Sequence, residues 1–260
     1  MDILNALFRW LHILAGIIWI GLLYFFNWVN APFAATMDGD TKKKVVPELM
    51  PRVLFWFRWG AAWTWITGVL LLFIVFYHEK TMMFGADGNW TAGAIVMLAL
   101  TFLAPFVYDA LQKSGLGKNP KVFGTAAFVL MAVVIALMFH WARFGYRAFN
   151  IHMGALLGTT MAFNVWFRIW PGQKKVIAAT KEGAAPDAAL VAFVGTRSRH
   201  NVYMSVPLLW AMIDHHTEGF AGDRFGISSH YAFGVFLVVT LLAWHIVWQL
   251  YRKAPKVKGF

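Results

Sequence analysis

Long runs of hydrophobic residues alternate with short polar segments along the whole chain. A helix needs roughly 20 apolar residues to cross a bilayer, and seven segments meet or approach that length. These segments are Asn5–Val29, Leu54–Tyr77, Trp90–Leu111, Val122–Ala142, Phe149–Trp170, His200–Ile213 and Ser229–Tyr251. Because the apolar runs are continuous rather than alternating, they predict helices and exclude a membrane β-barrel. The expected fold is all-α, a polytopic transmembrane helical bundle of about seven spans.

The sixth segment and the loop before it are the least regular part of this pattern. His200–Ile213 is short and contains Pro207, which predicts a kink, a tilt or a partial crossing. The longest loop, about residues 171–199, holds two helix-compatible stretches, Lys174–Lys181 and Asp187–Val194, separated by a glycine and a proline. We expect this loop to lie on the cytoplasmic membrane surface as two amphipathic turns.

The charge distribution indicates topology rather than nucleic-acid binding. The chain is 60% hydrophobic and 13% charged, with a formal net charge of +11. Most lysines and arginines follow the first, third, fifth and seventh segments, while the alternate loops hold few. By the positive-inside rule the N-terminus is expected outside and the C-terminus in the cytoplasm, which requires an odd number of spans. The first apolar run is too long for a signal-peptide core. Residues 1–260 are therefore expected to form a single integral membrane domain.

The histidines are the candidate chemical groups of the chain, which has nine of them and no cysteine. An imidazole within a span is costly and is by default a functional hypothesis. The depth of each histidine predicts an outer tier of His12, His140, His152 and His230 and an inner tier of His200 and His245. Two tiers suit one or two b-type haems held by axial histidines, with the pairing open. The lack of cysteine excludes thiolate ligation and covalent haem attachment within this chain.

Other residues complete the set of candidates. Arg199, at the end of a span, is a candidate partner for a haem propionate or another anion. Asn164 and Ser205 are candidate polar groups lining a pocket. We expect His78, His215 and His216 to be solvated, and a zinc or copper site at the adjacent pair is the alternative. Each single histidine can also simply hydrogen-bond a neighbouring helix.

Two local strings carry a family resemblance. The first apolar segment contains Trp10-Leu11-His12-Ile13-Leu14-Ala15-Gly16-Ile17-Ile18-Trp19-Ile20-Gly21, and the sixth contains Ser198-Arg199-His200-Asn201-Val202-Tyr203-Met204-Ser205-Val206-Pro207. Asn164-Val165-Trp166 and Ile169-Trp170-Pro171 close the fifth. Together they resemble the N-terminal membrane domain of the bacterial cytochrome-c-type urate oxidases (urate hydroxylases), in the same order over nearly the whole chain.

The resemblance implies a bacterial cytoplasmic (inner) membrane protein that takes part in urate hydroxylation and passes electrons to the respiratory chain. In that family a cytochrome c domain follows the membrane domain. These 260 residues contain no Cys-x-x-Cys-His motif. We therefore expect a separate electron acceptor, such as a cytochrome c.

The prediction is a membrane-integral redox protein that binds haem b and works as, or within, an oxidoreductase. One alternative is an enzyme that hydroxylates urate by itself, with Arg199, Asn201, Tyr203 and Ser205 as substrate contacts. Another is a non-catalytic subunit of a respiratory or photosynthetic complex. The lipid bilayer is the expected environment in all three cases, and no nucleic-acid partner is expected.

Overall fold

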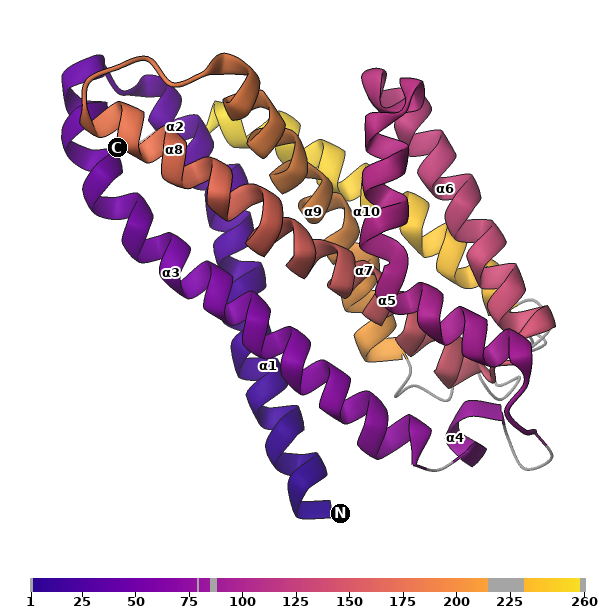
Figure 1. Ribbon diagram of the computed structural model, residues 1–260. Helices are drawn as coiled ribbons and strands as arrows, with labels where there is room; N and C mark the ends of the chain where they lie inside the picture. The colour runs from indigo at the N-terminus through magenta and orange to yellow at the C-terminus, as the bar shows by residue number, and fades with distance from the viewer. Residues whose placement is uncertain (1, 79, 85–87, 215–231, 258–260) are drawn as a thin grey trace. The chain divides into compact units, whose positions relative to one another are not determined.

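The computed structural model describes residues 2–78, 80–84, 88–214 and 232–257, and all regular secondary structure in these ranges is helical (Figure 1). The α-helices are α1 (Asp2–Tyr24), α2 (Ala31–Thr36), α3 (Gly39–Leu71), α4 (Lys80–Phe84), α5 (Ala92–Lys113), α6 (Pro120–Ala136), α7 (Tyr146–Asn164), α8 (Trp170–Lys181), α9 (Ala188–Asp214) and α10 (Ala232–Lys253). The prediction of an all-α fold is confirmed.

Short π-helical or 3₁₀-helical segments follow several of these α-helices. The π-helical segments are Phe25–Asn30, Leu72–Tyr77, Leu137–Trp141 and Val165–Ile169, and the 3₁₀ segments are Gly115–Lys118 and Ala254–Lys256. A π-helical turn closes hydrogen bonds over five residues instead of four and often marks a functional site.

Five segments of the described chain are long and apolar enough to cross a membrane, and they mark the chain as a membrane protein. They are Asp2–Thr36, Gly39–Tyr77, Ala92–Lys113, Pro120–Trp141 and Phe233–Lys256. The two other predicted spans are helical but are not among these five. Phe149–Trp170 extends from α7 through the π-helical segment to the first residue of α8, and His200–Ile213 lies within α9. Seven spans and the orientation of the chain therefore stay predictions.

The start of α3 differs from the expected second span. The apolar run begins at Leu54, but the helix begins at Gly39 and includes Pro47 and Pro51. Asp38 precedes its first turn, and the Thr41 amide donates a 2.8 Å hydrogen bond to the Asp38 carboxylate. This bond satisfies a backbone donor that the first turn leaves without a partner. The helix is therefore extended by a polar cap and not by hydrophobic residues.

The segment between α8 and α9 is broken where the sequence predicts, because Gly183 has a positive φ of 75° and Pro186 follows it. The expected second amphipathic turn, Asp187–Val194, is not a separate element. It belongs to the start of α9, which continues through Pro207 to Asp214. The short sixth segment is therefore the second half of a helix of 27 residues.

The chain divides into two compact units. Unit 1 comprises Met1–Asn5, Val69–Thr160 and Val206–Ala243, and unit 2 comprises Ala6–Gly68, Met161–Ser205 and Trp244–Phe260. The expectation of a single membrane domain stays a prediction.

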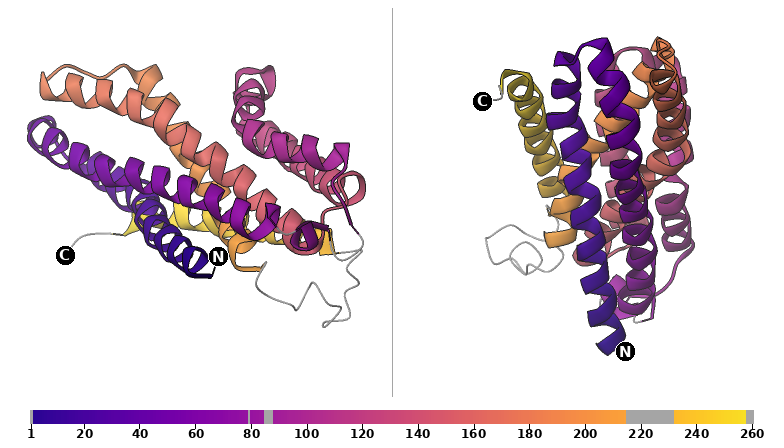
Figure 2. Two further views of the ribbon diagram at one scale, coloured as in Figure 1. Left: turned by 60° about the horizontal axis from the view of Figure 1, so that its bottom comes forward. Right: turned by 90° about the vertical axis from the view of Figure 1, so that its left-hand side faces the viewer.

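Each unit has its own core. In unit 1 the fully buried side chains include Ile135, Met138 and Phe149. In unit 2, α1 and α3 run side by side (Figure 2), and a Cβ on Gly60 would lie 3.1 Å from the Trp19 backbone nitrogen. The glycine therefore allows these two helices to approach closely.

Candidate functional site

His12 lies on α1 in unit 2, and a threonine of α3 fixes its protonation. His12 Nδ1 is 3.2 Å from Thr67 Oγ1. The Thr67 hydroxyl has one hydrogen, which it donates to the Trp63 carbonyl at 2.6 Å. The hydroxyl oxygen must therefore accept the His12 hydrogen bond, so that Nδ1 carries the proton and Nε2 the lone pair. Within the part of the chain that the structure describes, His12 Nε2 forms no hydrogen bond.

A glycine makes room for the His12 ring. A Cβ on Gly68 would lie 3.0 Å from His12 Cε1 and 3.4 Å from Nδ1. Any larger residue at position 68 would push the ring away from Thr67. The position of His12 thus depends on two consecutive residues of α3. Thr67 accepts its hydrogen bond, and Gly68 leaves space for its ring.

His152 lies on α7 in unit 1 and is fully buried. Its Nδ1 is 2.6 Å from the Ala148 carbonyl oxygen, which can only accept, so Nδ1 carries the proton. Nε2 then accepts a hydrogen bond from the Tyr77 hydroxyl at 3.0 Å. The rings of Phe76 and Phe144 lie beside the imidazole, with centroids 6.4 and 4.9 Å away. His152 has the same tautomer as His12, in a more enclosed environment.

The other predicted histidines are placed differently. His140 is exposed in unit 1 beside Phe139. His245 is exposed in unit 2, with its Nε2 3.3 Å from the Gln249 amide nitrogen. His200 is half-buried in unit 2.

Two guanidinium groups next to His200, those of Arg197 and Arg199, act on it electrostatically. Their positive charge favours an anion nearby. His78 is exposed, whereas His215, His216 and His230 lie outside the described residues.

The predicted tiers do not form a cluster of metal ligands in residues 2–78, 80–84, 88–214 and 232–257. In these ranges no three histidine, aspartate or glutamate side chains lie close enough together to hold a metal ion. Axial ligation of a haem by one or two of these histidines stays a prediction.

Asn164 and Asn201 form a buried amide pair in unit 2. Asn164 Nδ2 donates to Asn201 Oδ1 at 2.9 Å, and Asn201 Nδ2 donates to the Met161 carbonyl at 3.0 Å. Arg197 Nη1 lies 3.5 Å from Asn164 Oδ1 and is only 1% exposed as a residue. Arg197 was not among the predicted site residues, although it lies four residues before Asn201 and so on the same face of α9.

The remaining predicted substrate contacts lie elsewhere in unit 2. Ser205 is fully buried, and its Oγ is 2.9 Å from the Tyr24 hydroxyl oxygen. The Tyr203 ring stacks on Tyr251 with centroids 6.1 Å apart, and the Arg199 guanidinium lies 5.2 Å from the centre of the Tyr251 ring. The proposed urate contacts therefore divide between a buried network and an aromatic cluster.

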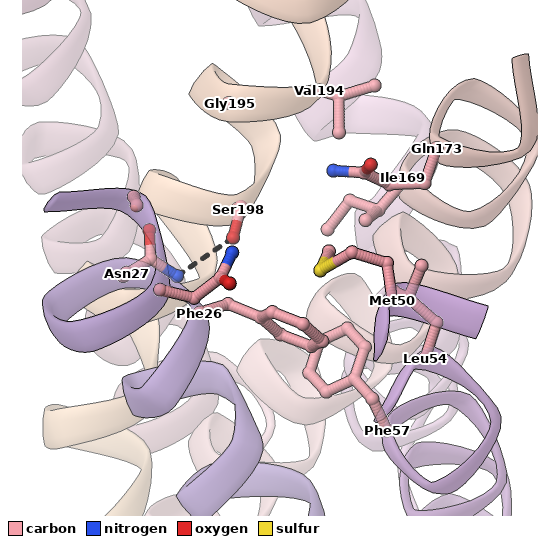
Figure 3. Close-up of a pocket in the computed structure, with 12 residues that line it drawn as sticks. Phe26, Asn27, Met50, Leu54, Phe57, Ile169, Gln173, Val194, Gly195 and Ser198 are labelled. Atoms are coloured by element: carbon pink, nitrogen blue, oxygen red, sulfur yellow. Dashed lines mark hydrogen bonds between the residues drawn. The ribbon is translucent and has the colours of Figure 1, made fainter. Parts of the chain in front are cut away.

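A cavity of about 150 Å³ lies in unit 2, and none of the predicted site residues lines it. The residues around it come from four parts of the chain: Phe26, Asn27, Asn30, Ala31, Met50, Leu54, Phe57, Ile169, Gln173, Val194, Gly195 and Ser198. Figure 3 shows the Gln173 amide directed into this space and the hydrogen bond from Asn27 to Ser198 at its edge. The cavity is a second candidate site, and no sequence motif marks it.

Comparison with known families agrees with the resemblance in the sequence. The model of the family described as "Urate oxidase N-terminal" matches residues 37–256, and the chain belongs to this family. No curated protein and no solved structure matches the chain.

Proposed function

Starting from membership of the urate oxidase N-terminal family, we propose that this chain is the membrane component of a urate-oxidase-like oxidoreductase. We further propose that it binds haem b through His12 in unit 2 and His152 in unit 1. One observation carries the haem proposal: both imidazoles donate Nδ1–H to a protein oxygen. Metal-ligating histidines almost always donate their other ring N–H in this way, because it fixes the ring and raises the basicity of the ligating nitrogen.

The donor chemistry at both positions fits a haem iron. Haem iron is held by neutral imidazoles in many proteins, and His12 offers a lone pair on Nε2 that no described residue occupies. At His152 the Tyr77 hydroxyl donates to the equivalent nitrogen, so His152 would have to give up this hydrogen bond in order to hold an iron. Bound haem b would supply one-electron transfer, with its potential set by axial ligation, burial and hydrogen bonding.

The protein groups around each histidine have separate tasks. Thr67 and the Ala148 carbonyl hold the rings in one orientation. Phe76 and Phe144 exclude water from His152, which is fully buried. A dry surrounding strengthens each electrostatic interaction with the ligand. These contacts favour a rigid imidazole at each position.

The remaining parts of the prediction belong to the same proposal. His140, His200, His230 and His245 are the candidates for a second axial position, and Arg199 is the candidate partner for a propionate. Electrons would leave to a separate acceptor such as a cytochrome c, at a bacterial cytoplasmic membrane.

The first experiment is a reduced-minus-oxidised absorption spectrum with a pyridine haemochrome assay on the purified protein, expressed with ample haem. We expect one or two b-type haems per chain. His12→Ala and His152→Gln should each lower the haem content, whereas His78→Ala, at an exposed position that is not a ligand candidate, serves as the matched control. A haem-free wild-type protein, or full haem content in both variants, would show the proposal to be wrong. Size-exclusion chromatography and circular dichroism of each variant exclude loss of haem through misfolding.

A second candidate function is urate hydroxylation by this chain alone, with Asn164, Asn201 and Arg197 as the groups that support it. The guanidinium would offset the charge of a purine anion, and the two amides would exchange their present hydrogen bonds for bonds to the ring. The test is urate-dependent oxygen uptake by the purified chain, with Asn201→Leu as the variant. Uptake that is absent in the wild type excludes this second function and leaves the haem proposal intact.

A further inference from the structure

The cavity of unit 2 contains polar groups that the protein itself leaves without partners. Both the nitrogen and the oxygen of the Asn27 side-chain amide form hydrogen bonds within the protein. The nitrogen donates to the Leu23 carbonyl and to Ser198 Oγ, both at 2.9 Å. Asn27 Oδ1 accepts from Tyr251 at 2.8 Å. By contrast, the carboxamides of Asn30 and Gln173 form no hydrogen bond with any described residue, and Ser198 Oγ accepts from Asn27 without donating its hydroxyl hydrogen to the cavity wall. Polar groups in such a position need water or a ligand.

The walls of the cavity are uncharged. The residues that line it include no lysine, arginine, histidine, aspartate or glutamate. Most of the surface is hydrocarbon, and the Phe26 and Phe57 rings meet edge to face with centroids 5.2 Å apart. A charged ligand would lose its hydration here without gaining a counter-ion. The cavity therefore favours a neutral, largely apolar ring with a few hydrogen-bonding atoms.

The size of the cavity limits the ligand to one ring. Its volume is about 150 Å³, and an engineered apolar cavity of ~150 Å³ in another protein holds a benzene molecule. A six-membered ring with two small substituents therefore fits, and a two-ring purine anion suits neither the volume nor the lack of charge.

We propose that this cavity binds the ring of a quinone or its quinol. A quinone is uncharged and lipid-soluble, and its two carbonyl oxygens accept hydrogen bonds from the Ser198 hydroxyl and from the amide groups of Asn30 or Gln173. The quinol donates to the oxygens of the same amides. Both oxidation states therefore find partners in the same set of side chains. The proposal does not depend on haem, because none of the histidines lines the cavity.

Gly195 provides a direct way to fill the cavity. It lines the space, and a Cβ built on it would meet no heavy atom within 4 Å. Gly195→Val should therefore occupy the ring site without displacing the backbone, and valine in a helix is no worse than glycine. Gly21, on α1, also has no heavy atom within 4 Å of its Cβ position and does not line the cavity. Gly21→Val is the matched control.

The test measures binding of 1,4-benzoquinone and of hydroquinone to the detergent-solubilised full chain by saturation-transfer NMR and calorimetry. The chain has no cysteine for the quinone to alkylate. p-Xylene is the matched ligand, since methyl groups replace both oxygens on the same ring. We expect saturable binding to the wild type and to Gly21→Val, and loss of binding in Gly195→Val. Gln173→Leu and Ser198→Ala should each weaken binding about tenfold, as loss of one hydrogen bond would.

Three results would overturn the proposal: no saturable binding of either oxygenated ring to the wild type, unchanged binding to Gly195→Val, or p-xylene binding as tightly as both oxygenated rings. Measuring haem-free and haem-loaded protein in parallel separates this outcome from the haem proposal. Binding that persists in the haem-free protein supports the quinone site even where haem ligation fails.

Discussion

Replacing Thr67 by valine tests whether His12 is held as a metal ligand. Valine keeps the branched shape of threonine but has no hydroxyl. The change removes the 3.2 Å contact with His12 Nδ1 and the 2.6 Å hydrogen bond from the threonine hydroxyl to the Trp63 carbonyl. Of these two contacts, only the one between Thr67 and Nδ1 involves the His12 imidazole. Its loss removes the side-chain partner of Nδ1–H and leaves the ring its hydrogen bond to the Thr64 backbone.

The expected effect follows from the role of the outer hydrogen bond. Loss of such a partner typically costs 10–100-fold in metal affinity, which corresponds to about 1.4–2.8 kcal/mol. The dissociation constant for haem at the His12 position should rise by about that factor. The reduction potential should rise as well, because an imidazole without an acceptor for Nδ1–H donates less electron density to ferric iron.

Haem titration into the haem-free protein, followed by the Soret absorbance, measures this change. Thr67→Ser keeps the hydroxyl and should bind haem like the wild type. Thr240→Val is a matched control, since Thr240 is buried and its hydroxyl donates to the Phe236 carbonyl at 2.8 Å. Wild-type haem affinity in Thr67→Val, together with haem loss in His12→Ala, would refute the idea that the threonine prepares His12 for ligation.

Three further outcomes are expected. Gly60→Val should lower the free energy of unfolding in detergent by about 1–3 kcal/mol, because its Cβ would lie 3.1 Å from a backbone nitrogen of α1. The Thr41 backbone amide and then its hydroxyl lower the pKa of Asp38, so protection of the Thr41 amide from exchange should persist at neutral pH and disappear as the pH falls through that lowered pKa. Asp38→Ala should remove this pH dependence. Asn201→Leu should cost about 1–3 kcal/mol by leaving Asn164 without its acceptor, and the double leucine variant should cost less than the sum.

The sequence predicts much of the helical fold because the length of an apolar run is a local property. The all-α class and the break near Gly183 follow from single segments. The start of α3 does not, because a lysine-rich stretch with two prolines has no apolar signal and its helix depends on a capping bond from Asp38. The start of α9 at Ala188, before the expected segment His200–Ile213, was also missed. The expected segment already included Pro207, and the helix continues through this proline.

The candidate site was predictable only as a set of residue types. His12 and His152 are evident from their place in apolar runs, but two of their hydrogen-bond partners are distant in the sequence. Thr67 lies 55 positions from His12, and Tyr77 lies 75 positions from His152. Grouping by depth gave six equivalent histidines. Hydrogen bonding distinguishes two of them, which the sequence alone could not do. The cavity was missed for the same reason, since its polar groups come from separate segments and none belongs to a motif.

Within unit 2, the haem proposal and the quinone proposal use different residues and different interactions, which makes them independent. His12 is defined by a hydrogen bond that orients a lone pair, so its role depends on one hydroxyl and one glycine of α3. The cavity is defined by unpaired amides and a lack of charge, so its role depends on volume and neutrality. Gly195→Val should abolish ring binding and leave haem affinity unchanged, whereas Thr67→Val should do the reverse. A variant in either position that altered both properties would instead indicate that the haem and quinone ligands compete for one site.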